Sequence, residues 1–288
     1  MGSLTKIYQI FYKKGQIDQL DPAFIPLDCT RNPAPSLFEV YWQYRFYASG
    51  LYREADYTGL ISWRFQSKTR VPGKKFVDFI AKNPGFDVYF INPYPQLAYQ
   101  FFNVWGHGEH CHPGIADLAE RLLAEARYSA SLTDIGRNNH NTLLYCNYWV
   151  GNAIFWEAYI AFIKPLLELS IAIQPDGRKN PYFRMTIHDG GSAPFFPFIF
   201  ERLFSTFLLA IDGITALPYV YSREEILDRA ENHDERIILQ RCIPAIDDLD
   251  LRFSQKSSAQ HRALFITLTD CWNGRRKQSA PTESTTIR

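Results

Sequence analysis

The sequence lacks an excess of charge of one sign, and it lacks closely spaced cysteines. Its 31 basic residues nearly balance its 30 acidic residues, so the protein as a whole has no field that would attract nucleic acid. The five cysteines are widely separated and form no CxxC pair, which is typical of a reducing compartment rather than of a disulfide framework. These absences argue against a nucleic-acid-binding protein and a small secreted domain, and they favour the cytoplasm.

The glycine-rich patterns of the common nucleotide-binding folds are also missing. Neither GxGxxG nor GxxxxGK[ST] follows the first predicted strand, so neither a dinucleotide-binding site nor a P-loop is predicted. GxSxG is absent as well, which leaves Ser-His-Asp hydrolysis without support. A nucleotide bound by this chain would therefore need another kind of pocket.

No long hydrophobic run is free of charges. Residues 1–12 have no basic segment followed by an apolar run, so no signal peptide is expected. Segments 152–174 and 193–210 are apolar, but each contains charged residues and proline, so both are predicted to be buried core helices. Hydrophobic residues make up 46% of the 288 residues, enough for a large core, and the 16% of aromatic residues offer faces on which a sugar or base can stack.

Strand-like and helix-like segments alternate along the chain. Strands are predicted at 6–12, 56–65, 87–91, 142–150 and 217–221, and helices at 36–49, 74–82, 96–105, 114–128, from 152 onward, 195–211 and 223–250. Ser36 and Glu39 have the spacing of a capping box at the start of one of these helices. This order predicts a single α/β domain over residues 1–272, with a mostly parallel central sheet flanked by helices, and a disordered polar and basic tail at 273–288. In such a sheet, ligands bind beyond the C-terminal ends of the strands.

The stretch WGHGEHCHPG, at residues 105–114, places three histidines, a glutamate and a cysteine within six positions. We expect it in a turn between two helices. His107, His110 and His112 could hold zinc if their rings converge, but their spacing does not match HExxH. A zinc site, part of an active site and an ordinary polar loop all remain open from the sequence.

Charged residues beside apolar segments provide further candidates. Glu201 and Arg202 are the only charges in segment 193–210, so they must be paired, solvated by a cleft or used in a site. Asp189 lies in a glycine-rich loop from which it could approach a substrate, although a simple turn is the ordinary alternative. Arg64 and Lys68 lie at and just beyond the end of the strand predicted at 56–65 and could hold a diphosphate, although solvated surface charges would look the same.

Five blocks between residues 36 and 210 together resemble the glycosyltransferases of bacterial capsule and lipopolysaccharide clusters. The blocks are FEVYWQYRFY, DYTGLISWRF, NPYPQLAYQFFNVWGHGEHCHPGIADLAERLL, NTLLYCNYWVGNAIFWEAYIAFIKPLLEL and PFIFERLFSTFLL. The resemblance implies a GT-A-like fold, a nucleotide-sugar donor such as a UDP-galactose form, and a glycan or lipid-linked glycan acceptor. It highlights Tyr57, Gly59, Arg64, His112, Asp117, Asn147, Glu201 and Arg202.

Glycosyl transfer needs cationic or hydrogen-bonding groups at the leaving diphosphate and, for inversion, a base for the acceptor hydroxyl. The catalytic candidates are Asp189, Glu201, His112 and Glu109. The donor-binding candidates are Tyr57, Gly59, Arg64, Lys68, Asn92 and Arg202. The acceptor-binding candidates are Asn147 and Trp105.

Enzymes with a GT-A fold usually hold a divalent cation through Asp-x-Asp after a central strand. Here segment 87–91 is followed by Asn92-Pro93, so dependence on Mg or Mn stays open, and Arg64, Lys68 or the histidine-rich stretch are candidates to supply the charge. Two rival functions remain: a metal-dependent hydrolase centred on the three histidines, and a non-catalytic glycan-binding module. The leading hypothesis is a glycosyltransferase of the cytoplasm that also associates peripherally with the inner face of the inner membrane.

Overall fold

A six-stranded sheet with one reversed strand forms the centre of the protein. The computed structural model describes residues 3–128, 131–132, 135–172, 180–188, 191–253 and 259–278. The strands are β1 (Thr5–Phe11), β2 (Ile25–Asp28), β3 (Tyr57–Ser62), β4 (Val88–Phe90), β5 (Trp149–Gly151) and β8 (Ala216–Pro218). Their order in the sheet is β2-β1-β3-β5-β4-β8.

Five of these strands run in the same direction. β1 is parallel to β2 and β3, and β4 is parallel to β8, whereas β5 is antiparallel to both β3 and β4. The C-terminal ends of the five parallel strands therefore share one edge of the sheet with the N-terminal end of β5. The predicted α/β fold with a mostly parallel sheet flanked by helices is confirmed.

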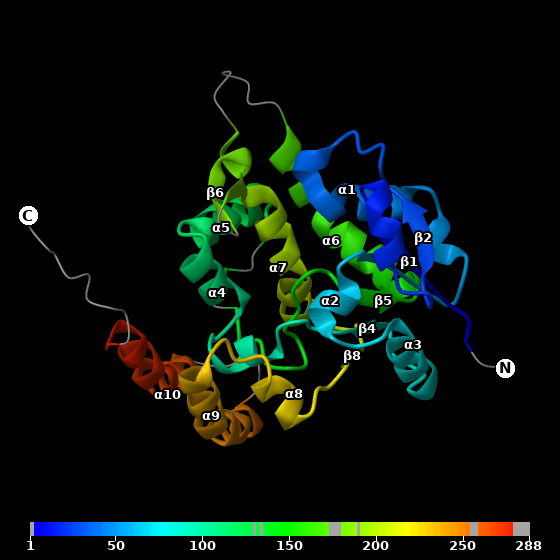
Figure 1. The fold of residues 1–288 in the computed structure, drawn as a ribbon. Helices are drawn as coiled ribbons and strands as arrows, with labels where there is room; N and C mark the ends of the chain where they lie inside the picture. Colours follow the sequence, from blue (N-terminus) through cyan, green and yellow to red (C-terminus); the bar gives the residue numbers. More distant parts are fainter. Residues whose placement is uncertain are drawn as a thin grey trace, which may run out of the picture.

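Ten α-helices occur in the part of the chain that the structure describes. They are α1 (Phe38–Ala48), α2 (Phe65–Thr69), α3 (Gly73–Lys82), α4 (Val104–Cys111), α5 (Ile115–Glu125), α6 (Ala153–Ile171), α7 (Phe195–Ala210), α8 (Arg223–Leu227), α9 (His233–Arg252) and α10 (Ala259–Gln278). Short 3-10 helices are η1 (Lys14–Gln19), η2 (Pro35–Leu37), η3 (Leu51–Arg53), η4 (Pro95–Tyr99) and η5 (Pro181–Phe183). In Figure 1, α7 runs between α4 and α5 on one side and α1 and β1 on the other, while α9 and α10 lie together below α4.

Helices α6 and α7 are core helices, as predicted. α7 buries 13 of its 16 residues, and a helix that is apolar almost all round needs cover on every side. Trp149 of β5 packs against Trp156 of α6, with ring centroids 4.5 Å apart, and against Phe204 of α7. No helix among the described residues is both long and apolar enough to cross a membrane.

Two segments near the centre of the chain differ from the prediction. Residues 104–111 of the histidine-rich stretch form α4 rather than a turn, because the Asn103 side chain accepts hydrogen bonds from the amides of Trp105 and Gly106 and caps the helix. Only the end of the predicted strand at 142–150 is extended as β5, because Cys146 and Asn147 both adopt left-handed backbone conformations.

Three other elements were not foreseen. The segment between the predicted strand at 6–12 and the predicted helix at 36–49 contains β2, a short edge strand that is mostly exposed and so lacks a clear alternating pattern. Before the predicted helix at 195–211, β6 (Met185–His188) and β7 (Gly191–Pro194) pair as an antiparallel hairpin. α10 extends from Ala259 to Gln278 and so includes residues 273–278 of the predicted tail, and residues 279–288 lie outside the described part.

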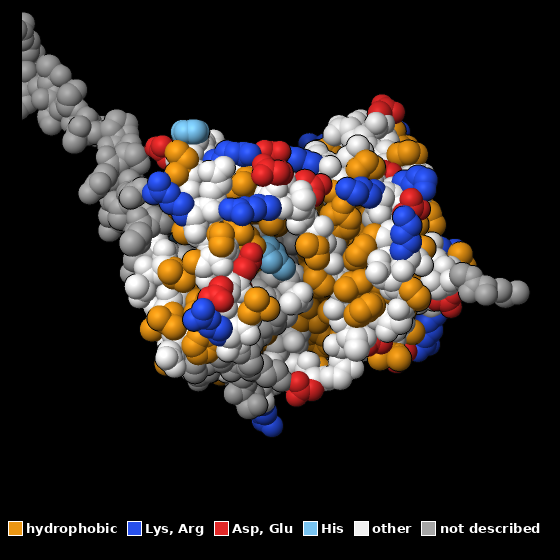
Figure 2. Space-filling view, turned by 90° about the horizontal axis from the view of Figure 1, so that it is seen from below, with side chains coloured by type: hydrophobic (Ala, Val, Ile, Leu, Met, Phe, Trp, Pro, Cys, Tyr) orange, Lys and Arg blue, Asp and Glu red, His pale blue; other side chains and the backbone are white. Residues whose placement is uncertain are grey.

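Basic side chains are not gathered in one place on the face seen from below. Figure 2 shows Lys and Arg interspersed with Asp and Glu there, and hydrophobic side chains in a band through the middle. On this face, positively and negatively charged side chains are therefore mixed and form no patch of one sign.

Candidate functional site

A cavity of about 290 Å³ lies at the edge where the parallel strands end, and we call it the sheet-edge cavity. Its walls come from the residues after β1 and β3, the start of α1, α2, the turn before β5, the β6–β7 hairpin and α7. The lining residues are Tyr12, Phe38, Glu39, Val40, Ser62, Trp63, Arg64, Lys68, Cys146, Asn147, His188, Pro197, Phe198 and Glu201. This is the edge at which ligands bind in open α/β sheets.

Two cationic side chains line the cavity. Arg64 is exposed, whereas Lys68 is half-buried and its Nζ lies 3.1 Å from the Sγ of Cys146. Burial alone would lower the pKa of Lys68, but Cys146, Tyr94 and Glu201 raise it overall. Burial and the charge of Glu201 raise the pKa of Cys146 to about 12, so at neutral pH Lys68 faces a neutral thiol and remains a cation.

Arg229, just after α8, fixes the backbone around Lys68. Its guanidinium donates to the carbonyl of Lys68 at 2.8 Å and also to the carbonyls of Thr69 and Pro93. It also stacks over the ring of Tyr221, 4.8 Å from the centroid. One side chain thus ties the end of α2 to the segment after β4.

Two carboxyl groups, those of Glu39 and Glu201, line the same cavity as these cations. Glu201 accepts a hydrogen bond from the backbone amide of Cys146 at 2.8 Å, and its other oxygen is 3.7 Å from Arg202. Burial raises the pKa of Glu39, Lys68 opposes this shift, and Glu201 reinforces it. The cavity therefore brings cations and carboxylates together in a partly desolvated space.

Strained backbone and unpaired polar atoms also occur here. Among the described residues, five non-glycine residues have positive φ, and three of them line the cavity, namely Phe38 (φ 50°), Cys146 (φ 65°) and Asn147 (φ 54°). Strained conformations cluster at functional sites because the surrounding structure must hold them in place. The Oδ1 of Asn147 and the Oη of Tyr12 are buried and have no hydrogen-bond partner among the described residues. A ligand with hydroxyl or amide groups would satisfy both atoms.

His112 lies behind the cavity wall rather than in it. Its ring stacks on Phe198 with centroids 3.9 Å apart, and its Nδ1 is 3.0 Å from the carbonyl of Ile187. Burial and the nearby Arg202 lower the pKa of His112 to about 4, so the ring is neutral at pH 7. A neutral ring that donates from Nδ1 to this carbonyl leaves Nε2 as an acceptor.

Four of the predicted site residues come together in the sheet-edge cavity: Arg64, Lys68, Asn147 and Glu201. Arg202, predicted to bind the donor, has a buried guanidinium that donates to the carbonyls of Val104 and Phe198. It thus links α4 to α7 within the core. Asp189, a catalytic candidate, lies outside the described residues.

Three other predicted donor-binding residues do not line this cavity. Tyr57 is at the opposite end of β3 from Arg64. Gly59 is within β3, where an added Cβ would come 2.7 Å from the carbonyl oxygen of Trp149, so this glycine permits close packing of strands. Asn92 forms a turn in which its side chain bonds the backbone of Tyr94.

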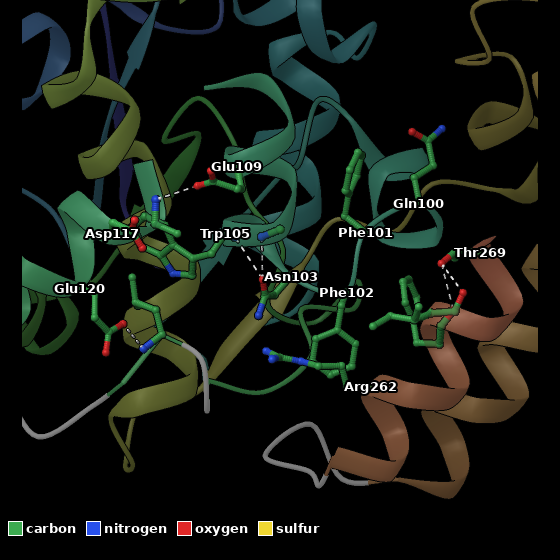
Figure 3. Close-up of a pocket in the computed structure, with 15 residues that line it drawn as sticks. Gln100, Phe101, Phe102, Asn103, Trp105, Glu109, Asp117, Glu120, Arg262 and Thr269 are labelled. Atoms are coloured by element: carbon green, nitrogen blue, oxygen red, sulfur yellow. Dashed lines mark hydrogen bonds between the residues drawn. The ribbon is translucent and has the colours of Figure 1, made fainter. Parts of the chain in front are cut away.

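A second, more apolar pocket of about 420 Å³ contains the remaining predicted residues. Figure 3 shows Glu109, Asp117 and Glu120 on one side of it and Arg262 and Thr269 of α10 on the other. Trp105, predicted to bind the acceptor, donates to Thr206 from its indole nitrogen. Glu109, predicted to be catalytic, accepts from the amides of Gly114 and Ala116 and caps the start of α5. Both side chains are therefore used in holding α4 in place, away from the sheet-edge cavity.

The side chains of His107 and His110 in α4 and of His112 just after it do not converge on one point. His107 packs between Phe101 and Tyr145, with centroids 4.8 and 5.0 Å away, whereas His112 packs on Phe198. Among the described residues, no group of three or more His, Cys, Asp or Glu side chains could hold a metal ion. The geometry does not favour the zinc-dependent hydrolase.

Sequence reasoning missed several residues of the cavity, chiefly Tyr12, Phe38, Glu39 and Cys146. Tyr12 directly follows β1, so its position after a strand was an available signal. Glu39 was expected to close a capping box with Ser36, but α1 begins at Phe38 and has no side-chain cap, which leaves this carboxyl group beside the cavity.

Comparison with known proteins gives one remote likeness. No protein-family model and no curated protein matches the sequence. The chain is similar to the solved structure of the bifunctional glycosyltransferase WbbM in its apo form, with a TM-score of 0.47 and 15% sequence identity over 76% of this chain. It spans 45% of that chain's length.

Proposed function

We propose that the sheet-edge cavity binds a nucleotide-sugar donor and transfers its sugar to an acceptor hydroxyl, as in a GT-A-like glycosyltransferase. The observation that carries this proposal is the placement of Arg64 and Lys68 beside Glu39 and Glu201, at the C-terminal edge of a mostly parallel sheet. The two cations suit a diphosphate, and the carboxylates suit proton transfer from an attacking hydroxyl.

The remaining walls fit the other parts of such a donor. Trp63 is half-exposed at the cavity and offers a face to a base or a sugar ring. The unpaired oxygens of Asn147 and Tyr12 are placed to accept or exchange hydrogen bonds with sugar hydroxyls. The cavity thus combines charge, stacking and hydrogen-bonding groups in one space.

Charge stabilisation at the leaving diphosphate comes from Arg64 and Lys68 in this proposal. Among the described residues of the wall, the acidic side chains are Glu39 and Glu201, and the positive charge of Lys68 interacts electrostatically with both. This donor set does not fit a Mg or Mn site, so no step is assigned to a metal ion.

The donor and acceptor that we propose are those implied by the resemblance of the five sequence blocks. We propose a UDP-sugar donor, such as a galactose form, and a glycan or lipid-linked glycan acceptor in the synthesis of a bacterial surface polysaccharide. Its place would be the cytoplasm, at the inner face of the inner membrane, where an acceptor on a lipid would be within reach.

Calorimetric titration with UDP tests the proposal directly. Wild-type protein should bind UDP, and Lys68→Met should weaken binding by about tenfold or more because one charged contact to phosphate is lost. Lys82→Met, which removes an exposed lysine at the end of α3, is the matched control.

A panel of nucleotide sugars then tests transfer, through slow donor hydrolysis or sugar addition. If the wild type neither binds nor hydrolyses any of them, the proposal is wrong. Binding of oligosaccharides without any nucleotide would instead identify a glycan-binding module.

A further inference from the structure

The two carboxyl groups of the sheet-edge cavity differ in their hydrogen bonding. Glu201 holds the Cys146 amide with one oxygen and has Arg202 beside the other. A proton placed on Glu201 would weaken both contacts and loosen the turn that carries Asn147. These two contacts indicate that Glu201 positions the Cys146–Asn147 turn in the cavity wall.

The carboxyl group of Glu39 makes no comparable contact with another described residue. Its carboxyl group interacts with its own backbone amide, and no other described residue donates a hydrogen bond to it. It lies in the first turn of α1, half-buried and on the cavity wall. Of the two carboxyl groups, Glu39 is therefore the one that can gain a proton without breaking a contact to another residue.

Charged and titratable groups from several other parts of the fold lie around the cavity that Glu39 lines. They are Tyr12 after β1, Arg64 after β3, Lys68 of α2, Glu201 of α7, Cys146 and Tyr148 before β5, and His188 of β6. Burial raises the pKa of Glu39 and makes the carboxylate a better base, while Lys68 opposes complete neutralisation.

We propose that Glu39 accepts the proton of the attacking hydroxyl while Glu201 positions the Cys146–Asn147 turn. This inference rests on the proposed glycosyl transfer and identifies the residue that acts as base in it. The hydroxyl oxygen bonds to the anomeric carbon, and the bond from that carbon to the diphosphate breaks with its electron pair on the phosphate. The hydroxyl proton moves to an Oε of Glu39, which becomes a neutral acid.

The test compares Glu39→Gln, Glu39→Asp and wild type with UDP-galactose as donor. Glu39→Gln should lower kcat by about 100-fold or more, with the donor KM changed by less than about threefold. The wild-type rate should rise with pH as Glu39 loses its proton. That rise should disappear in Glu39→Gln and persist in Glu39→Asp, which keeps a carboxylate. Glu168→Gln, an exposed change on α6, should behave as wild type.

Infrared spectroscopy gives a readout that does not need turnover. The carbonyl stretch of a protonated carboxyl should persist in wild type to higher pH than ordinary glutamic acids allow, and Glu39→Gln should lack that band. A rate within about threefold of wild type in Glu39→Gln, loss of UDP binding in that variant, or survival of the band would each overturn the inference. Absence of nucleotide binding in the wild type would refute the proposed function instead, and the infrared band would still decide whether Glu39 holds a proton.

Discussion

The backbone amide of Cys146 donates to the Oε1 of Glu201 over 2.8 Å, and this bond joins α7 to the left-handed turn before β5. Two consecutive non-glycine residues with positive φ are costly unless surrounding contacts hold them. Glu201, from a helix more than fifty positions away in the sequence, supplies such a contact. The orientation of Asn147 in the sheet-edge cavity consequently depends on a side chain of another element.

Replacing Glu201 with alanine should release this turn. The amide of Cys146 loses its acceptor, which should lower the free energy of unfolding by about 1–3 kcal/mol and weaken UDP binding as Asn147 loses its orientation. Urea denaturation and calorimetry measure the two effects. Glu201→Gln keeps an oxygen acceptor, so it should lose less stability than the alanine variant; equal losses would contradict the role assigned to the hydrogen bond.

Gly59→Ala should impair the fold rather than ligand binding alone. The new methyl group would come 2.7 Å from the Trp149 carbonyl oxygen and 2.8 Å from a methyl of Val150, so β3 and β5 would have to move apart. Overpacking of this kind costs about 1–3 kcal/mol of unfolding free energy, measurable by urea denaturation. Gly15→Ala is the control, because its added Cβ meets no atom within 4 Å. Equal stability of the two variants would argue against a packing role for Gly59.

His112 should make the protein less stable in mild acid. Its pKa in the folded protein is lowered to about 4 from an ordinary 6.5, so the unfolded chain takes up a proton first as the pH falls. The contribution of His112 to stability is complete above about pH 6.5 and decreases between 6.5 and 4. Denaturation at several pH values should show a shallower slope across this window in His112→Gln. His233→Gln, at the exposed start of α9, should keep the wild-type slope, and an unchanged slope in His112→Gln would rule out this origin of acid sensitivity.

Arg229→Met should destabilise the wall that carries Lys68. Three backbone carbonyls lose their donor at once, and the expected loss is about 2–3 kcal/mol of unfolding free energy together with weaker UDP binding. Arg70→Met removes a single bond, to the carbonyl of Asp228, and should cost clearly less. If thermal and urea denaturation show equal losses of stability in the two variants, Arg229 does not hold the end of α2 against the segment after β4 in the way described above.

The fold class was predictable because its strongest signals are local. The alternating strand at β1 and the apolar helices α6 and α7 follow from residue periodicity and composition. β2 was not predictable from its own residues, since an exposed edge strand is stabilised by pairing with β1 and not by a buried face. Histidine-rich α4 was missed because its start depends on the Asn103 cap, whereas its two glycines suggest a turn.

The candidate site was predictable only in part, for a related reason. Arg64 lies just after β3 and Lys68 in the following helix α2, and the rule that ligands bind at strand ends is sufficient to select them. Glu39 lines the cavity because α1 begins at Phe38, and Cys146 lines it because its backbone forms a left-handed turn. Both features depend on contacts from distant elements. Conversely, Arg202 and Glu109 were selected as donor-binding and catalytic candidates because they are charged, yet their partners include backbone groups of neighbouring helices.

Removal of divalent cations should leave nucleotide binding largely intact. Arg64 and Lys68 already supply positive charge in the sheet-edge cavity, and the described residues offer no convergent set of three metal ligands. Calorimetric titration of UDP should therefore give affinities that agree within about threefold in EDTA and in excess Mn²⁺. Raising the salt concentration should weaken binding in both conditions, since the contacts are charged and partly exposed. A strict requirement for Mn²⁺ or Mg²⁺ would contradict this scheme and would point to a ligand outside the described residues, for which Asp189 is the candidate to replace with asparagine.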